Sequence, residues 1–493
     1  MSTAHVDLSS LVLGQSLRDA VPELVVDWSA AEAPDPSLVM LNHQLAGDLG
    51  LDPTVLASDR GVAVLTGTAV PDGSHPVAMA YAGHQFGSYA PLLGDGRALL
   101  LGELTSPHGQ RVDLHLKGSG RTPFARGGDG KAGLAPMLRE YVMAEAMHAL
   151  GVPTTRSLAV VRTGEAIARD GDRTGAILAR TAASHLRVGT FEYAARLPDP
   201  TVLRRLADYT ISRHDPDLTE AAHPYRELLA AVAERQAALV AQWMLIGFIH
   251  GVMNTDNMTI SGETIDYGPC AFMDRVDPAT VYSSIDTGGR YRYGQQPRVA
   301  QWNLIRLAES LLPLDDDLDA AVEASHAVLD AFPAVYEAHW DAGMRRKLGL
   351  TTERPGDHEL FNDMFSAMET VEADLTTTFR GLADDLRAGG ASGADLVATA
   401  FDSWKGRWRE RLAAEGRDPG AIADDLDAAN PVYVPRNHLV EEALAAATGG
   451  DLAPFERLLS VLTDPYQAQP GNGRYAEPAP DSFSAGYRTF CGT

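Results

Sequence analysis

Cysteine is scarce in this chain of 493 residues, which contains only Cys270 and Cys491. Two cysteines cannot form the disulfide framework of a small secreted domain, nor a zinc site built from several thiolates. Long hydrophobic runs are also missing, since no stretch of about 18 uncharged apolar residues occurs. The best candidate for a membrane span, residues 237–249, is too short and predicts a buried helix instead.

The N-terminus lacks the features of a secretory signal. Residues 1–14 have neither a basic start nor a continuous apolar stretch, and Arg18 and Asp19 follow soon after. Together with the scarce cysteines, this predicts a protein of the reducing cytoplasm, with no membrane partner.

Basic residues are outnumbered, because 41 Lys and Arg residues stand against 66 Asp and Glu residues and the formal net charge is −25. Such a charge favours solubility and repels phosphate backbones. No nucleic-acid partner is therefore expected. Apolar residues make up 45% of the chain, which is enough for a substantial core.

The pattern of apolar residues changes along the chain. From about residue 61 to 165, short apolar runs alternate with glycine-rich turns, as is typical of a compact sheet. One segment of this half, 136–150, has apolar residues at helical spacing, with Pro136 at its start and Gly151 after its end. Beyond about residue 200, amphipathic segments predict helices over 224–248, 303–312, 318–348 and 437–446.

These patterns predict an α+β fold in which a β-rich lobe with one central helix precedes a larger helical lobe, the outline of a protein-kinase-like bilobal fold. A ligand is expected between the two lobes. The expected boundaries are an N-terminal extension over 1–60, the β-rich lobe over 61–195, the helical lobe over 196–463 and an irregular tail over 464–493.

The most informative segment is 250–268. Asn257 stands five residues after Val252, and Asp266 begins an Asp-Tyr-Gly sequence. In protein kinases, an Asn five residues beyond the catalytic Asp and the Asp of Asp-Phe-Gly hold magnesium. Asn257 and Asp266 would supply two of the hard oxygen ligands that Mg²⁺ prefers.

Val252 stands where a kinase has its catalytic Asp, so the conventional base is missing at that position. Asp256, beside the predicted metal ligand, would replace it. A polar loop in which Asp266 caps a turn is the structural alternative for this segment.

Two further candidates lie upstream. Lys117 ends an apolar run, and Glu140 lies on the predicted helix 136–150. This order resembles the strand lysine and helix glutamate of kinases, in which the glutamate positions a lysine that contacts nucleotide phosphates. Taken singly, such residues are more often exposed and solvated, so their joint order carries the prediction.

Glycine-rich loops and two arginines add candidate phosphate contacts. The loops 94–97 and 127–131 would bring backbone amides and cationic side chains near phosphate oxygens, although neither is a Walker motif and each alone is typical of a plain turn. Arg180 and Arg187 both follow apolar residues, and arginine binds phosphate through two hydrogen bonds. Surface ion pairing is the alternative for both.

Together these segments resemble the selenoprotein O family, also called SelO or YdiU, a group of kinase-like proteins. The resemblance covers nearly the whole chain. Its most specific pieces are 81–87 (YAGHQFG), 93–97, 116–124, 250–257 with 266–268, 430–431 with 436–438, and 489–491.

The resemblance implies a protein adenylyltransferase, an AMPylator of the nucleotidyltransferase class. Such an enzyme transfers AMP from ATP to Ser, Thr or Tyr hydroxyls of protein substrates and releases pyrophosphate. The implied ATP orientation is reversed relative to kinases, which suits the replacement at Val252. Mg²⁺ is the implied metal, with Mn²⁺ as an alternative.

The resemblance also implies a role for each site residue. Asp256 would accept the proton, Asn257 and Asp266 would bind the metal, and Glu140 would orient Lys117. The implied nucleotide contacts are Gly94, Gly96, Arg97, Lys117, Asp129, Gly130, Arg180, Arg187 and Asp266.

Two other functions fit the same residues. An unconventional phosphotransferase would share the nucleotide site but attack a different phosphorus, and the missing Asp at Val252 argues against it. A non-catalytic pseudokinase would bind ATP without turnover, but it leaves the grouping of Asp256, Asn257 and Asp266 unexplained. The protein substrate and the choice between AMP and UMP transfer stay open.

Cys491 lies third from the end, in the region where some family members carry selenocysteine. Cys270 follows the predicted metal-binding segment. A disulfide between them that gates the site under oxidation is a hypothesis, and two unpaired thiols are the alternative.

Overall fold

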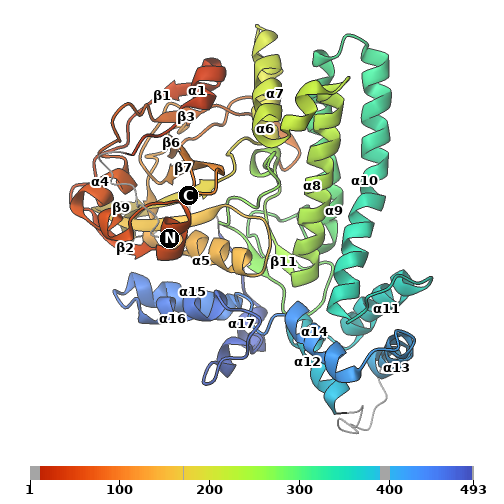
Figure 1. Ribbon diagram of the computed structural model, residues 1–493. Helices are drawn as coiled ribbons and strands as arrows, with labels where there is room; N and C mark the ends of the chain where they lie inside the picture. Colours follow the sequence, from red (N-terminus) through yellow and green to blue (C-terminus); the bar gives the residue numbers. More distant parts are fainter. Residues whose placement is uncertain (1–10, 170, 389–399, 491–493) are drawn as a thin grey trace.

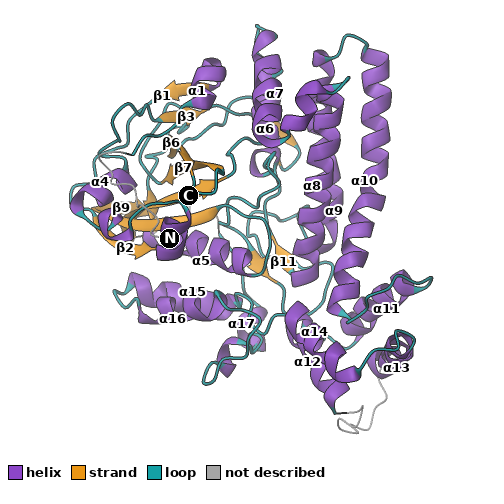
Figure 2. Cartoon of the chain, viewed as in Figure 1, coloured by secondary structure: helices purple, strands orange, loops and turns teal. Residues whose placement is uncertain are grey.

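The computed structural model describes residues 11–169, 171–388 and 400–490, and it combines an antiparallel sheet with many helices (Figures 1 and 2). The sheet and α5 (Leu134–Ala149) lie on one side of the molecule (Figure 1). The long helices α8 (Pro224–Ile246), α9 (Gln296–Leu311) and α10 (Leu318–Lys347) lie on the other (Figure 1). This confirms the predicted mixture of helix and sheet.

The main sheet has the strand order β1-β3-β6-β7-β10-β9-β2, with β8 paired to β10. Residues before position 61, predicted as an extension, supply both edge strands of this path, β1 and β2. The bounds are β1 Val25–Asp27, β2 Ser37–Leu41, β3 Val77–Met79, β6 Ala98–Thr105, β7 Arg111–Lys117, β8 Ala132–Gly133, β9 Arg156–Arg169 and β10 Gly171–Ala182.

The two faces of the sheet differ in chemistry, as β7 illustrates. Leu114 and Leu116 are buried in an apolar layer under the helices α2 (His43–Asp48), α3 (Pro53–Leu56) and α4 (Asp59–Thr66). Since side chains alternate along a strand, Asp113, His115 and Lys117 lie on the opposite face. That face carries the candidate site.

Helix α5 (Leu134–Ala149) is the central helix that the sequence predicts, and it begins just before Pro136. It packs against β9 and β10 and also against α15 (Asn437–Thr448) and α16 (Ala453–Leu462). The expectation of one helix within 61–195 is wrong, because α6 (Val188–Ala194) and most of α4 also lie in that range, while α2 and α3 lie in the predicted extension. Helices α2–α4 are short, begin at the capping side chains Asn42, Asp52 and Ser58, and contain too few turns to show a period.

The helical half contains the four predicted helices, with shifted ends. Helix α8 ends at Ile246 because Gly247, with φ of 73°, caps it and the chain then enters β11 (Phe248–Ile249). At Gly343, α8 and α10 come so close that a Cβ atom would lie 2.1 Å from the Leu245 side chain. The helices are α7 Thr201–His214, α8 Pro224–Ile246, α9 Gln296–Leu311, α10 Leu318–Lys347, α11 Asp357–Thr370, α12 Leu375–Arg387, α13 Ala400–Ala413, α14 Pro419–Ala429, α15 and α16.

The tail after residue 463 is mostly irregular and contains the short helices Gly473–Tyr475 and α17 (Asp481–Ser484). Its end returns to the site region, where the Thr489 hydroxyl donates a hydrogen bond of 2.6 Å to the Pro269 carbonyl. Cys270, the next residue, is fully buried, and burial raises the pKa of its thiol to about 12. Cys491 lies outside the described residues, so the proposed disulfide stays a hypothesis.

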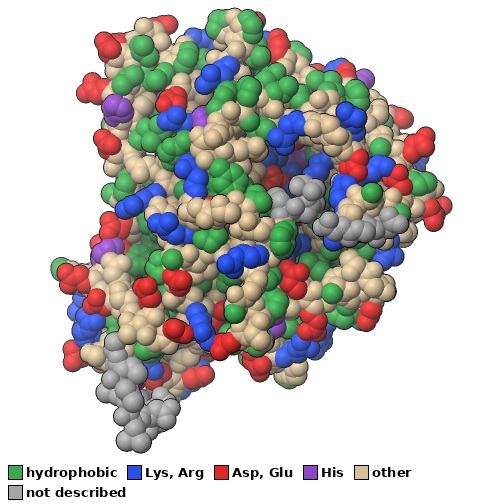
Figure 3. Space-filling view, turned by 180° about the vertical axis from the view of Figure 1, so that it is seen from behind, with side chains coloured by type: hydrophobic (Ala, Val, Ile, Leu, Met, Phe, Trp, Pro, Cys, Tyr) green, Lys and Arg blue, Asp and Glu red, His purple; other side chains and the backbone are tan. Residues whose placement is uncertain are grey.

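Acidic and basic side chains are interspersed over the face in Figure 3, with no single dominant patch of either sign. Within the described part of the chain, no helix has both the length and the apolar character needed to cross a bilayer.

Candidate active site

The residues that the sequence predicts for the site line one cavity of about 470 Å³. Both halves of the molecule contribute, since the walls come from the sheet, α5 and the loop after α8. The predicted residues in the lining are Gly94, Gly96, Arg97, Lys117, Asp129, Gly130, Glu140, Arg180, Arg187, Asp256, Asn257 and Asp266.

The loop that holds the predicted catalytic and metal-binding residues is anchored at both ends. Strand β11 (Phe248–Ile249) pairs with β12 (Ala271–Phe272) and closes the loop between them. Inside it, His250 Nε2 donates to the Ile265 carbonyl over 2.9 Å. Burial lowers the pKa of His250 and keeps the imidazole neutral. This contact brings the first part of the loop to the segment just before Asp266.

Lys117 joins three elements at the centre of the cavity. Its Nζ lies 2.6 Å from Glu140 Oε1 on α5 and 2.7 Å from Asp266 Oδ1 on the loop. The structure therefore contains the lysine–glutamate ion pair that the order of residues predicts. All three side chains are largely buried, so the pairs are shielded from solvent.

Asp266 has a strained backbone and a cationic surrounding. Its φ of 62° lies in the left-handed region that non-glycine residues rarely adopt. Besides Lys117, Arg180 Nη1 lies 2.8 Å from Oδ1 and Arg187 Nη1 lies 2.7 Å from Oδ2. Burial opposes the charged form, but Lys117, Arg187 and Arg180 outweigh it and hold the pKa of Asp266 well below its usual range.

Backbone pairing places Arg187 in the site. Val188 N donates to the Met258 carbonyl and Ile260 N to the Leu186 carbonyl, both over 2.9 Å. Arg187 Nη1 also donates to the Asp256 carbonyl over 2.6 Å. The arginine thus supports the backbone of the predicted base while its guanidinium contacts Asp266.

Asp256 combines burial with an unsatisfied oxygen. Its Oδ2 accepts a hydrogen bond of 3.3 Å from Gln85, whereas Oδ1 is buried and has no hydrogen-bond partner within the described residues. Burial raises the pKa of Asp256 to about 6, against the opposing effect of Arg187. A carboxylate of this pKa is mostly ionised at neutral pH and can accept a proton.

The segment 81–87, to which the sequence assigned no role, packs on the loop that carries Asp256. His84 N donates to Thr255 Oγ1 over 2.7 Å, and Phe86 N donates to Asn254 Oδ1 over 3.0 Å. A Cβ atom on Gly83 would lie 2.6 Å from Asp256 Oδ1. Only glycine permits this approach, and the family motif was the available signal for it.

Asn257 and Asp266 provide oxygen atoms that fit a hard divalent cation. Asn257 Nδ2 donates to the Val252 carbonyl over 2.9 Å, and no described residue donates to its Oδ1. Its amide oxygen and the Asp266 carboxylate are therefore the donors that Mg²⁺ would use.

The first glycine-rich loop is packed tightly. A Cβ atom on Gly94 would lie 2.4 Å from the Phe124 ring, and one on Gly96 would lie 2.8 Å from the Phe124 carbonyl. Asp95 between them is buried, and its amide donates to the Met79 carbonyl over 2.8 Å.

The second loop is held by surface ion pairs. Asp129 pairs with Arg169 at 2.8 Å, and Lys131 pairs with Glu165. A Cβ atom on Gly130 would lie 2.3 Å from the Gly120 backbone, so this loop also depends on glycine.

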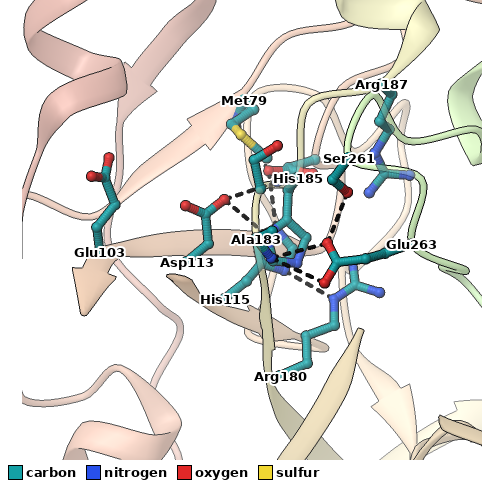
Figure 4. Close-up of polar contacts among 12 residues, drawn as sticks. Met79, Glu103, Asp113, His115, Arg180, Ala183, His185, Arg187, Ser261 and Glu263 are labelled. Atoms are coloured by element: carbon teal, nitrogen blue, oxygen red, sulfur yellow. Dashed lines mark hydrogen bonds and ion pairs between the residues drawn. The ribbon is translucent and has the colours of Figure 1, made fainter. Parts of the chain in front are cut away.

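A buried histidine behind the cavity positions Arg180, and the sequence alone did not single it out (Figure 4). Arg180 Nε donates to His115 Nδ1 over 3.2 Å, so His115 Nε2 carries the proton and donates to Asp95 over 3.3 Å. Burial, together with Arg180 and Arg187, lowers the pKa of His115 well below its usual value.

Further buried side chains behind His115 hold its ring in place. The His115 ring stacks on His185 at 4.2 Å, and His185 Nδ1 lies 3.0 Å from Asp113 Oδ2. Arg213 donates to the other oxygen of Asp113 over 2.6 Å. The alternate polar residues of β7 thus form one continuous network that ends at Asp266.

Comparisons with known proteins identify the family of this chain. The family described as "Protein adenylyltransferase SelO" matches residues 8–463. The protein nucleotidyltransferase YdiU of Rhodococcus jostii is 56% identical over 499 residues, which cover 100% of this chain and 96% of that protein. The protein nucleotidyltransferase YdiU of Mycolicibacterium smegmatis is 57% identical over 482 residues, with 96% of each chain covered. This chain is therefore a nucleotidyltransferase and belongs to the SelO family of protein adenylyltransferases.

Proposed function

We propose that the 470 Å³ cavity binds ATP and transfers AMP to a Ser, Thr or Tyr hydroxyl of a protein substrate, with release of pyrophosphate. The observation that carries this proposal is the meeting of the Lys117–Glu140 ion pair with Asp266 and Asp256 in one cavity. Membership in an adenylyltransferase family supports the direction of transfer.

The nucleotide would bind through the cations that now surround Asp266. Lys117, Arg180 and Arg187 are donors without acceptor capacity, and phosphate oxygens are their natural partners. Glu140 keeps Lys117 in place, and His115 does the same for Arg180. The remaining contacts would come from Gly94, Gly96, Arg97, Asp129 and Gly130, which line the same cavity.

The metal would be Mg²⁺, with Mn²⁺ as an alternative, held by Asn257 Oδ1 and the Asp266 carboxylate. Nucleotide oxygens and water would complete the shell, because no three His, Cys, Asp or Glu side chains form a metal cluster in the described ranges. When bound, the metal would neutralise part of the negative charge of the phosphates.

Asp256 would act as the base. The proton of the acceptor hydroxyl moves to the Asp256 carboxylate, which lines the cavity. The hydroxyl oxygen forms a bond to the α-phosphorus, and the bond between that phosphorus and the leaving pyrophosphate breaks. Gln85 and Arg187 keep the carboxyl group in place by holding its second oxygen and its backbone carbonyl.

We also propose a kinase-like bilobal arrangement in which the parts of the chain are divided after residues 60, 195 and 463. The cavity between the sheet with α5 and the loop after α8 supports the arrangement. From the composition we further propose a cytoplasmic location and no nucleic-acid or membrane partner.

The test uses ATP labelled on the α or the γ phosphate, with magnesium and a generic protein acceptor. We expect the protein acceptor to be labelled from the α label alone. This labelling should be lost in Asp256→Asn and in Asp266→Ala, and it should be kept in the surface control Asp277→Asn. Transfer of the γ label would indicate a phosphotransferase. ATP binding without any transfer would indicate a pseudokinase.

A further inference from the structure

A second cavity, of about 480 Å³, lies in the helical half and shares no lining residue with the active site. Helices α8, α10 and α14 supply most of its walls, and the segment after α5 closes one side. On α10, Gly343, Arg346 and Lys347 line the cavity, followed by Leu350 just after the helix end. This spacing places Lys347 on the side of the helix that faces the cavity.

Lys347 is a buried cation, with 7% of its surface exposed. Its Nζ lies 4.2 Å from the centre of the Phe379 ring, and it has no hydrogen-bond or ion-pair partner among residues 11–169, 171–388 and 400–490. Burial lowers the pKa of Lys347 to about 7. An unpaired buried ammonium is costly to a fold, so its presence calls for an explanation.

The other lysines of the chain all have acidic partners. Lys117 pairs with Glu140 and Asp266, Lys131 with Glu165, and Lys405 with Asp385. Lys347 differs from them within the described structure, and it is also the lysine that lines the second cavity. Lys347 therefore lacks an acidic partner among the described residues, and the Phe379 ring is the contact given for its ammonium.

The charges around the cavity favour an anion. Arg346 and Arg417 line it together with Lys347, and Asp425 is the acidic side chain in the lining. Asp425 already forms an ion pair with Arg417. This cationic excess stands in a chain of net charge −25.

The remaining walls are largely apolar. Apart from Gln242, Thr351 and glycines, they are formed by Leu150, Val152, Leu245, Ile246, Leu350, Ala428, Ala429 and the ring of Tyr466. A volume of about 480 Å³ falls within the usual range of small-molecule sites.

We propose that this cavity is a binding site for a small amphipathic carboxylic acid. The carboxylate pairs with the Lys347 ammonium, and the apolar body of the acid packs against Leu245, Ile246 and Leu350. Because the site is separate from the active site, this inference does not depend on the proposed function.

Octanoate and 1-octanol serve as probes, since they share a chain length and differ in charge. Calorimetric titration of the full-length protein should show octanoate binding at least about tenfold tighter than 1-octanol, as expected for a charge-assisted contact. Lys347→Met keeps most of the side-chain volume and should remove that preference. The control Lys405→Met, at a lysine that also lies over a phenylalanine ring, should leave it unchanged.

Ala428→Trp provides an independent test, because it fills the cavity from α14 without altering its charge. It should weaken the binding of both probes. Thermal melting checks that each variant is folded. The proposal would be overturned if the two probes bound equally well or if octanoate did not bind at millimolar concentration. It would also be overturned if a folded Lys347→Met protein kept the preference for octanoate.

Discussion

The ammonium of Lys117 lies 2.6 Å from Glu140 and 2.7 Å from Asp266, so one side chain connects strand β7, helix α5 and the loop after α8. Asp266 also pairs with Arg180 and Arg187, so its single carboxylate lies among three cations. Under the proposed function, polyphosphate oxygens would pair with these cations and leave Asp266 free to hold the metal.

Glu140→Gln should lower kcat/KM for ATP by about tenfold or more, because a charge-assisted hydrogen bond is worth about 1.5–3 kcal/mol. Initial-rate kinetics with varied ATP measure this loss. Glu442→Gln is the matched control, since Glu442 pairs with the exposed Arg474 and neither residue lines the cavity. Equal rates for the two variants would contradict a role of Glu140 in positioning Lys117.

Transfer should rise with pH through about 6, because Asp256 must be deprotonated to act as a base and burial raises its pKa to about 6. The Gln85 hydrogen bond favours the charged form, so Gln85→Leu should move this acidic limb to higher pH. The pH dependence of kcat/KM for both proteins is the measurement. A limb that stays in place would exclude Asp256 as its origin.

Gly83→Ala should reduce transfer strongly, since the new methyl group would lie 2.6 Å from Asp256 Oδ1. ATP binding should persist, because Gly83 does not line the nucleotide cavity. Gly288→Ala, at a glycine with open space around it, is the control. Loss of both binding and transfer in a folded Gly83→Ala protein would argue against a local effect on Asp256.

His115→Leu should raise KM for ATP by about tenfold, because Arg180 loses the acceptor that orients its guanidinium. His115→Gln retains a side-chain acceptor and should restore part of the affinity. Substrate-saturation curves for the two variants distinguish orientation from packing. Equal defects in both would indicate that the ring is needed only for its volume.

Arg436→Met should destabilise the protein by about 3–5 kcal/mol, since it leaves buried carboxylates unpaired. Arg436 is fully buried and lies 2.6 Å from Asp274 and 2.7 Å from Asp374. The free energy of unfolding in urea measures the loss. Arg474→Met, which removes an exposed pair with Glu442, should cost less than about 1 kcal/mol.

Much of the helical half follows from local sequence. Helices α8 and α10 are long enough for the helical spacing of their apolar residues to be recognised in the sequence. Their ends were predicted to within a few residues. Helices α2–α4 span a few turns at most and β1 spans three residues, so neither carries a readable period.

The sequence by itself determined the family, the order of the candidate residues and the expectation that Asn257 and Asp266 act together. Tertiary structure alone decided that β1 and β2 complete the sheet and that His115 supports Arg180. It also decided that Lys347 lines a second cavity, with no acidic partner among the described residues. These relationships depend on backbone segments far apart in sequence. Local propensity and residue spacing do not predict which side chain, far away in the sequence, will lie within hydrogen-bonding distance.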